Sequence, residues 1–345
     1  MNKIFFLLFN ILFSVTTRAR QKTENVIIVT LDGMRWQEVF GGVDEVLMND
    51  SIFNHDREGV KQKYWAASAE ERREKLFPFL WSTMATQGQL YGNRRYGNKL
   101  DNANPYWFSY PGYNEIFTGF PDTAINSNDK IPNPNENVLE YINKQKGYTG
   151  KIAVFTTWHA FPYILNSKRS GLYVNADVDT IRFNTPALQL INDMQFLTTR
   201  PIGVRPDVLT YMAGREYLKA YKPKLMYIAF DEPDDFAHAG LYDQYLGSAH
   251  AEDAMMADLW KTLQSIPQYK DKTTLIVTCD HGSKIEDSHE IWLAVTGPDT
   301  RPSGELKTAG QLYQEQIAAT IAQLLGFTFT TNHPVGDPIN SIYKR

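Results

Sequence analysis

Short runs of apolar residues that end at acidic side chains are the feature that most limits how this chain can fold. The clearest runs are Asn25–Leu31, which leads into Asp32-Gly33, and Lys224–Phe230, which leads into the segment Asp231 to His238. Runs with so few polar breaks are typical of strands that are covered on both faces. In a parallel sheet the carboxyl ends of such strands meet along one edge, where α/β proteins bind their ligands.

Strand-like and helix-like segments alternate along the rest of the chain. Further strands are expected at 151–156, 272–278 and 291–295, and helical patterns occur at 186–197, 207–221, 249–263 and 313–325. This alternation predicts an α/β fold with a mainly parallel central sheet and helices on both faces. We expect a single domain over residues 21–345, with irregular excursions at 41–68 and 120–136 that lie over the site.

Residues 1–20 differ in character from the rest of the chain. Lys3 precedes the apolar run Ile4–Phe13, and small polar residues then lead to a weak cleavage site near Ala19. This pattern indicates a signal peptide, with an uncleaved anchor as the alternative. We therefore expect an exported protein, periplasmic or extracellular, that has no membrane attachment after cleavage.

Composition excludes several classes of protein. Cys279 is the only cysteine, so an intrachain disulfide and a multi-cysteine metal site are both impossible. The formal net charge of −4 gives no reason to expect a nucleic-acid-binding surface. These data leave the oligomeric state open.

Carboxylate and imidazole side chains recur after the strand-like runs. Asp234 and His238 are four residues apart, so one turn of helix would direct both toward one point. Asp280-His281 follows another expected strand, and Asp32 follows the first. These are ligand types that zinc and similar divalent ions prefer. The alternatives are a solvated acidic loop at 231–238 and a helix-capping role for Asp32.

Ser109 is the candidate nucleophile. It follows aromatic, strand-like residues, and Pro111 suits the first turn of a helix that would begin beside it. A helix N-terminus favours an anionic oxygen, and a serine alkoxide held there would be a nucleophile. The alternative is that Ser109 only caps the helix.

Taken together, these residues resemble the alkaline phosphatase superfamily and, within it, the nucleotide pyrophosphatase/phosphodiesterase-like branch. The resemblance covers about residues 24–330. It depends on the strand ending at Asp32-Gly33, the Ser109-x-Pro111 segment that closes with Thr118-Gly119, the turn at 233–238, and Asp280-His281-Gly282. It implies an alkaline-phosphatase-like fold and a metal-dependent phosphoester hydrolase, either phosphatase or phosphodiesterase, with two divalent cations, most simply zinc.

The resemblance also implies roles for individual residues. One cation would take Asp32, Asp280, His281 and the Ser109 oxygen, and the other would take Asp234, His238 and a further histidine. The substrate would be a phosphorylated small molecule. Candidate contacts to it are Asn126, Asn128 or Lys130 for a phosphoryl oxygen, and Trp158 and His159 for an aromatic wall.

Two departures from the family pattern keep other functions open. The further histidine usually lies well downstream of Asp-His-Gly, whereas His289 is only eight residues past His281. His289 either fills that role or a ligand-bearing loop is missing, which would favour a catalytically impaired binding protein. Tyr113 stands where formylglycine sulfatases have an arginine, which argues against a sulfatase, and export argues against a phosphoglycerate-mutase-like enzyme.

Overall fold

The computed structural model describes residues 21–200, 202–283 and 287–344. The expected signal peptide at 1–20 lies outside these residues. Across the described ranges, no helix combines the length and the apolar character that crossing a membrane requires.

An eight-stranded sheet forms the centre of the molecule, in the order β5-β4-β6-β1-β7-β8-β2-β9. Strands β5, β4, β6, β1 and β7 are parallel, whereas β8 runs antiparallel to both β7 and β2. The mainly parallel α/β fold expected from the sequence is therefore confirmed. The strands are β1 (Asn25–Leu31), β2 (Gly88–Tyr91), β4 (Ile152–Thr156), β5 (Tyr173–Ala176), β6 (Leu225–Phe230), β7 (Thr273–Thr278), β8 (Leu293–Thr296) and β9 (Gly304–Glu305).

The central strands are apolar because helices cover both of their faces. Every residue of β1, β6 and β7 is buried, which explains why these segments read as continuous apolar runs. A second sheet pairs β3 (Asn98–Asp101) with β10 (Gly310–Tyr313) in parallel. The helix expected at 313–325 therefore begins only at Gln316, because Tyr313 belongs to β10.

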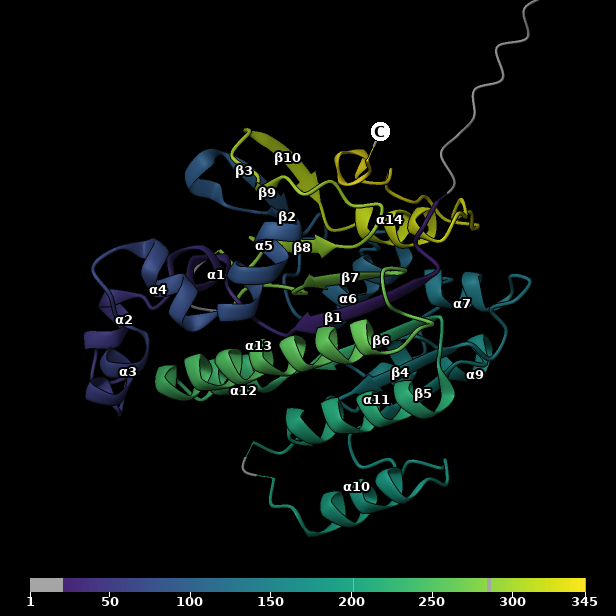
Figure 1. Ribbon diagram of the computed structural model, residues 1–345, viewed down its shortest axis with the longest axis horizontal. Coiled ribbons are helices and arrows are strands. Elements are labelled where there is room, and N and C mark those ends of the chain that lie inside the picture. The colour runs from purple at the N-terminus through teal and green to yellow at the C-terminus, as the bar shows by residue number, and fades with distance from the viewer. Residues whose placement is uncertain (1–20, 201, 284–286, 345) are drawn as a thin grey trace, which may run out of the picture.

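Helices of very different length connect the strands (Figure 1). They are α1 (Trp36–Gly41), α2 (Glu45–Asn49), α3 (Arg57–Tyr64), α4 (Ala69–Leu76), α5 (Ala85–Gln87), α6 (Ser109–Thr118), α7 (Val138–Asn143), α8 (Phe161–Ile164), α9 (Ser167–Ser170), α10 (Pro186–Leu197), α11 (Asp207–Tyr221), α12 (Glu232–His238), α13 (Tyr242–Ser265) and α14 (Gln316–Leu324), with a π-helical turn at Leu80–Met84 and 3-10 turns at Arg94–Tyr96 and Asn340–Ile342.

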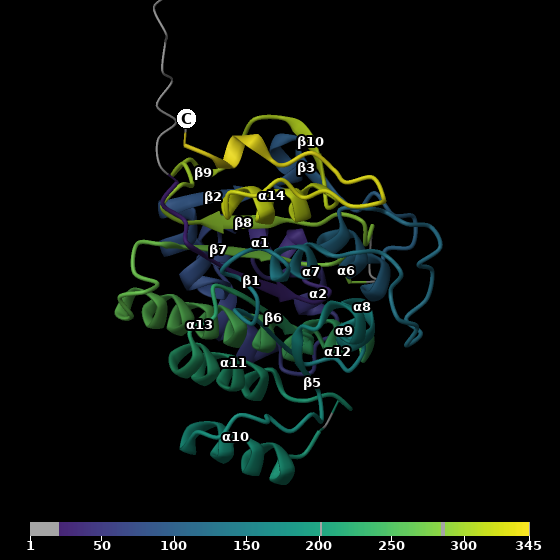
Figure 2. The same cartoon turned by 90° about the vertical axis from the view of Figure 1, so that its right-hand side faces the viewer.

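The helices form two layers around the sheet. In Figure 2, α11 and α13 lie on one side of the strands, and α6 and α7 lie on the other. Helix α11 packs on β4, β6 and α13, whereas α14 packs on α6 and α7. The nucleophile candidate Ser109 therefore starts a helix of the second layer, and the Asp234–His238 segment leads into the first layer.

One expected excursion is more regular than its composition suggested. Residues 41–68 contain α2 and α3. The carboxylates of Asp44 and Asp56 accept hydrogen bonds from backbone N–H groups of the first turns, so acidic residues that read as loop are helix N-caps. Residues 120–136 contain neither helix nor strand, as expected.

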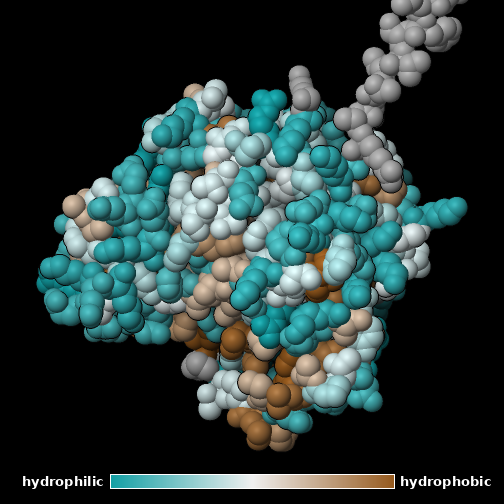
Figure 3. Space-filling view, viewed as in Figure 1, coloured by the Kyte–Doolittle hydropathy of each residue, from teal (hydrophilic) through white to brown (hydrophobic). Residues whose placement is uncertain are grey.

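Apolar side chains reach the surface mainly around α10, where the space-filling view is brown at its lower end (Figure 3). Leu190, Met194, Phe196 and Leu197 of this helix are all exposed. The opposite side of α10 buries Leu188 and Ile191. The helix therefore presents apolar residues to solvent as well as to the core.

Candidate active site

The parallel strands bring the sequence-predicted residues to one edge of the sheet. Asp32 follows β1, Asp231 follows β6, and Asp280 lies two residues beyond the end of β7. Since β6, β1 and β7 are adjacent in the sheet, these exits are neighbours. The geometric expectation that distant acidic segments meet at a common edge therefore agrees with the structure.

Asp32, Asp234 and His281 form one compact buried group, with one ligand atom from each within 4.8 Å of the others. His281 Nε2 lies 3.4 Å from Asp32 Oδ1 and 3.3 Å from Asp280 Oδ2. His281 Nδ1 is 2.7 Å from the Gly282 carbonyl oxygen, so it donates its proton there and leaves the Nε2 lone pair toward the carboxylates. Acceptors that face one another in this way suit a bound cation.

Ser109 completes this group from the opposite helix layer. It is the first residue of α6, after an extended Phe108, so it begins the helix and is not its N-cap. Its Oγ lies 3.3 Å from His281 Nε2. The hydroxyl is thus at a helix N-terminus and beside the imidazole, the position that the nucleophile role requires.

Two glycines allow the elements of the site to approach closely. A Cβ on Gly33, which has φ +63°, would lie 2.4 Å from Asp234 Oδ1. A Cβ on Gly112 of α6 would lie 2.6 Å from the Asp280 carbonyl oxygen. Larger residues at these positions would push Asp234 away from Asp32, and the Ser109 helix away from Asp280.

Burial makes the carboxylates of this site reluctant to carry charge without a counter-ion. Burial raises the pKa of Asp32 well above its ordinary value, and the neighbouring Asp280 and Asp234 raise it further. Burial and Asp234 likewise raise the pKa of Asp280. Asp32 Oδ1 and Asp280 Oδ2 also have no hydrogen-bond partner among the described residues. These residues fit a divalent cation, which would satisfy both oxygens and offset the repulsion.

Asp234 and His238 lie on one face of α12 and contact each other directly. His238 Nε2 is 2.9 Å from Asp234 Oδ2, which confirms the proximity expected from their spacing of four. Asp207, at the start of α11, holds the beginning of this short helix by accepting backbone N–H groups from Asp231, at 3.1 Å, and from Glu232, at 2.9 Å. Helix α12 therefore positions Asp234 and His238, and the Asp207 carboxylate of α11 in turn holds the start of α12.

Several residues that sequence reasoning did not assign to the site hold its backbone and carboxylates in place. Tyr113 donates its phenolic hydrogen to Asp32 Oδ2 at 2.8 Å. Asn102 Nδ2 and Gln314 Nε2 donate to the Asp280 carbonyl oxygen at 2.7 and 2.8 Å. Tyr113 could have been found, because it lies one helical turn after Ser109. Asn102 and Gln314 act on a main-chain oxygen, which leaves no pattern in the sequence.

The residues that the sequence suggested as substrate contacts have different surroundings. Asn126 and Asn128 are both exposed, and Asn128 Oδ1 accepts the backbone N–H of Tyr110, the residue after Ser109, at 2.9 Å. Lys130 and His159 line one pocket. Trp158 is half-buried, and its ring packs edge-on against Phe161 at 6.2 Å. Asn128 is thus tied to the Ser109 helix, and Lys130 and His159 share a cavity.

His289 lies outside the three-residue group. Its ring packs against Trp107, two residues before Ser109, with ring centroids 4.8 Å apart. Its backbone oxygen accepts a hydrogen bond from the Asn102 N–H at 2.9 Å. Its Nδ1 is buried without a hydrogen-bond partner among the described residues. His289 is therefore held beside the nucleophile helix with one unsatisfied ring nitrogen.

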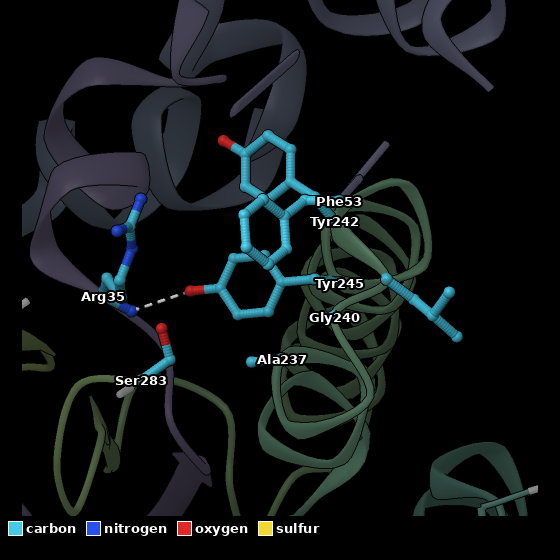
Figure 4. Close-up of a pocket in the computed structure, with 8 residues that line it drawn as sticks. Arg35, Phe53, Ala237, Gly240, Tyr242, Tyr245 and Ser283 are labelled. Carbon is cyan, nitrogen blue, oxygen red and sulfur yellow. Dashed lines mark hydrogen bonds between the residues drawn. The ribbon is translucent and has the colours of Figure 1, made fainter. Parts of the chain in front are cut away.

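A small cavity separates the strand exits from α13 (Figure 4). Its volume is about 10 Å³, room for about one water molecule. Phe53, Tyr242 and Tyr245 form one wall, with Arg35 and Ser283 opposite, and the backbone N–H of Arg35 donates to the Tyr245 hydroxyl at 2.9 Å. This cavity is too small for a substrate, so it packs the site rather than forming its entrance.

Comparison with known families identifies the chain. The family model described as type I phosphodiesterase / nucleotide pyrophosphatase matches residues 42–299. The chain belongs to this family. The matched region includes Ser109, Asp234 and Asp280, while Asp32 precedes it. Membership makes the protein a hydrolase of phosphate esters and confirms the family resemblance seen in the sequence. A search of curated proteins found no match.

Solved structures show the same fold at low sequence identity. The alkaline phosphatase PafA is 10% identical, with a TM-score of 0.63 over 94% of this chain and 100% of that one. An inactive variant of the murine ectonucleotide pyrophosphatase/phosphodiesterase 5 bound to AMP is 13% identical, with a TM-score of 0.55 over 92% and 98%. The lipoteichoic acid synthase LtaP from Listeria monocytogenes is 14% identical, with a TM-score of 0.57 over 89% and 73%.

Proposed function

We propose that this protein is an exported phosphoester hydrolase that uses Ser109 as its nucleophile between two divalent cations, most simply zinc. The observation that carries the proposal is the position of Ser109 Oγ, 3.3 Å from His281 Nε2, whose ring nitrogen also lies beside Asp32 Oδ1 and Asp280 Oδ2, two buried oxygens with no hydrogen-bond partner among the described residues. A serine that only began a helix would not need to face two buried carboxylates and an imidazole.

The two cations would be held by different parts of the site. Asp32, Asp280, His281 and Ser109 would hold one, and Asp234 and His238, with His289 as the candidate third ligand, would hold the other. When bound, such cations favour the serine alkoxide and offset the charge of the phosphoryl oxygens.

The remaining chemistry belongs to the chain itself. Ser109 Oγ, having lost its proton to solvent, would form a bond to phosphorus as the bond from phosphorus to the leaving oxygen breaks, and that oxygen would take up a proton to leave as the alcohol. Water would then bond to phosphorus as the bond to Oγ breaks, and Oγ would regain a proton. At the start of α6 the Tyr110 N–H already donates to Asn128 Oδ1, Pro111 has no N–H, and the Gly112 N–H donates to the Phe108 carbonyl, so the Ser109 hydroxyl is the group that would meet the substrate. Tyr113, by its hydrogen bond to Asp32 Oδ2, would keep Oδ1 of that carboxylate turned toward Ser109 and His281.

The direct test compares the wild type with Ser109→Ala on p-nitrophenyl phosphate and bis(p-nitrophenyl) phosphate, with zinc added. We expect the variant to lose turnover and Ser109→Thr to retain part of it, since threonine offers the same hydroxyl. Ser68→Ala is the matched control, because Ser68 is a genuine helix N-cap that accepts the Glu71 N–H. It should cost about 1 kcal/mol of stability and leave turnover intact. Equal rates for the wild type and Ser109→Ala would remove Ser109 from the mechanism.

Export has a separate test. The full chain expressed with its own N-terminus should be recovered outside the cytoplasm, with an intact mass that shows cleavage near Ala19. Recovery of the uncleaved chain with the membrane fraction would support the anchor instead.

A further inference from the structure

A pocket of about 300 Å³ opens beside the candidate active site. We call it the lysine pocket, and it is lined among others by Lys130, His159, Lys168 and Asp179. His159 follows β4, and Ala176, the last residue of β5, also lines the pocket. The pocket therefore lies at the carboxyl ends of β4 and β5, on the sheet edge that carries Asp32 and Asp280.

Two lines of contact join the lysine pocket to the nucleophile helix. On one, Asn128 accepts the Tyr110 N–H at 2.9 Å, and the Tyr110 hydroxyl donates to the Ile131 carbonyl at 2.6 Å, so the segment bearing Lys130 is tied to α6 at both ends. On the other, the Phe161 ring of α8 packs against Tyr113 of α6 with centroids 4.6 Å apart. Its neighbour Pro162 lines the pocket.

The charge of the pocket is positive. Lys130 and Lys168 are exposed, and neither ammonium group forms an ion pair with a carboxylate of the described residues. Burial lowers the pKa of His159, and the nearby positive charges of Lys130 and Arg200 lower it further. The opposing acid, Asp179, already accepts the Ala176 N–H at 3.0 Å.

The sheet fixes the separation between the pocket and Ser109. Strand β4 is two positions from β1, with β6 between them. At about 4.8 Å per strand spacing, the pocket lies roughly 10 Å along the sheet edge from the Asp32 exit. A group bound there would belong to the same substrate molecule as a phosphoryl group at Ser109, but several bonds away from it.

We propose that the lysine pocket binds a second anionic group of the substrate, a phosphate or a group of similar charge, so that the enzyme prefers phosphoesters with two separated anionic ends. This inference rests on the proposed function of Ser109 for the placement of the first phosphoryl group. Lysine ammonium groups bind phosphate as mobile point charges, which suits a pocket at the surface.

The test measures binding, so it does not depend on turnover. Zinc-loaded full-length protein is titrated calorimetrically with alkane-α,ω-diol bisphosphates of increasing spacer length and with the n-alkyl monophosphates of equal length, both as their methylenephosphonate analogues, which cannot be hydrolysed. We expect the bisphosphate to bind about tenfold more tightly at one matching spacer length, because two partly exposed ion pairs are added. The advantage should shrink at high salt, since the charges are near the surface.

Two lysine variants and one control test whether the lysine pocket causes the tighter binding of the bisphosphate. Lys130→Met and Lys168→Met should each reduce the ratio of bisphosphate to monophosphate affinity to below about threefold. Lys146→Met should leave the ratio unchanged, because Lys146 is an exposed lysine before the start of β4, at the other end of that strand.

These results test the lysine pocket independently of the role of Ser109. Equal affinity for mono- and bisphosphates at every spacer length would overturn the inference, and so would an advantage that survives in both lysine variants. A lysine-dependent advantage would support it even if Ser109→Ala kept full turnover, a result that would overturn only the role of Ser109.

Discussion

The two halves of the candidate site are built in different ways. The inner half, Asp32, Asp280, His281 and Ser109, is almost fully buried and comes from two central strands and α6. The outer half is the pair Asp234 and His238 on the seven-residue helix α12, and the His238 side chain is 42% exposed. The inner half is fixed by the sheet and α6, whereas the outer half depends on one short helix that buries Asp234 beside Asp32 and His281 and leaves His238 at the surface.

This difference predicts unequal roles for the two halves. Hydrogen bonds from Tyr113, Asn102 and Gln314 hold the inner carboxylates and backbone, so the inner geometry exists before a cation arrives. His238 is open to water, which can replace or supplement a ligand there. We therefore expect the inner cation to bind more tightly and the outer cation to exchange more readily.

The largest expected effect comes from removing a ligand of the inner half. Asp280→Asn should lower kcat/KM by at least about 10³-fold, because both the cation charge and its placement beside Ser109 are lost. His238→Ala should lower it by only about 10²-fold, because water can take the vacant ligand position of the outer cation. Steady-state kinetics at saturating zinc measure both.

The thermal stability of the metal-free variant distinguishes loss of a ligand from misfolding. The Asp280→Asn substitution removes a buried charge, so the metal-free variant should melt at a higher temperature than the metal-free wild type. A variant that is inactive and also less stable would contradict this account of the inner half.

Metal removal and pH should act together on stability. The pKa values of Asp32 and Asp280 are raised in the folded chain, chiefly by burial, so the metal-free fold binds protons more strongly than the unfolded chain. The resulting stability is fully present below the ordinary pKa of an aspartate and is lost as pH rises through the raised values. The melting temperature in EDTA should therefore fall between pH 5 and pH 8.

Zinc should reverse that fall. At a free concentration of one hundred times Kd, a cation adds about 2.7 kcal/mol, or about 5 °C for a chain of this size. Asp280→Asn should show a flatter pH dependence and a smaller response to zinc. A metal-free melting temperature that rises steadily from pH 5 to pH 8 would contradict the assigned direction.

The sequence predicted the convergence of Asp32, Asp280 and His281 because these residues follow long apolar strands. The strand-like approach expected before Ser109 was wrong, since residues 102–108 form no strand. Asp32 and Asp280 could be placed at one sheet edge from the strand pattern alone, and Asp234 and His238 from their spacing of four. The supports could not be predicted in this way. Asn102 and Gln314 are separated by most of the chain, and they meet only because β3 pairs with β10.

The limits of sequence reasoning are also clear at the excursions. Residues 41–68 read as loop because polar residues with several Asn, Asp and Gly fill much of the segment, yet Asp44 and Asp56 are N-caps whose helices are held by tertiary packing. A composition rule cannot distinguish a capping aspartate from a turn aspartate, because both use the same side-chain acceptor.

Tyr113→Phe tests whether the inner half is held in advance. Loss of the hydrogen bond to Asp32 Oδ2 should weaken zinc binding at the inner half by about tenfold and lower kcat/KM similarly, since groups that orient a metal ligand typically contribute this much. Tyr269→Phe is the matched control, because its buried hydroxyl donates to the Pro223 carbonyl at 2.7 Å, before the start of β6. Equal losses in both variants would indicate a general packing effect.

The smallest expected effect concerns His289 and the outer half. If His289 Nδ1 completes the shell around Asp234 and His238, His289→Phe should weaken the second zinc by on the order of threefold, because water can replace one nitrogen at this exposed cation. Phenylalanine keeps the ring contact with Trp107, so a loss reports the nitrogen and not the packing. His333→Phe is the control, since its ring stacks on Phe120 at 5.4 Å in another part of the molecule. Calorimetric zinc titration measures the affinity of each of the two sites. If His289→Phe binds the second zinc as tightly as the wild type does, His289 is not a ligand, and only Asp234 and His238 among the described residues would hold that zinc.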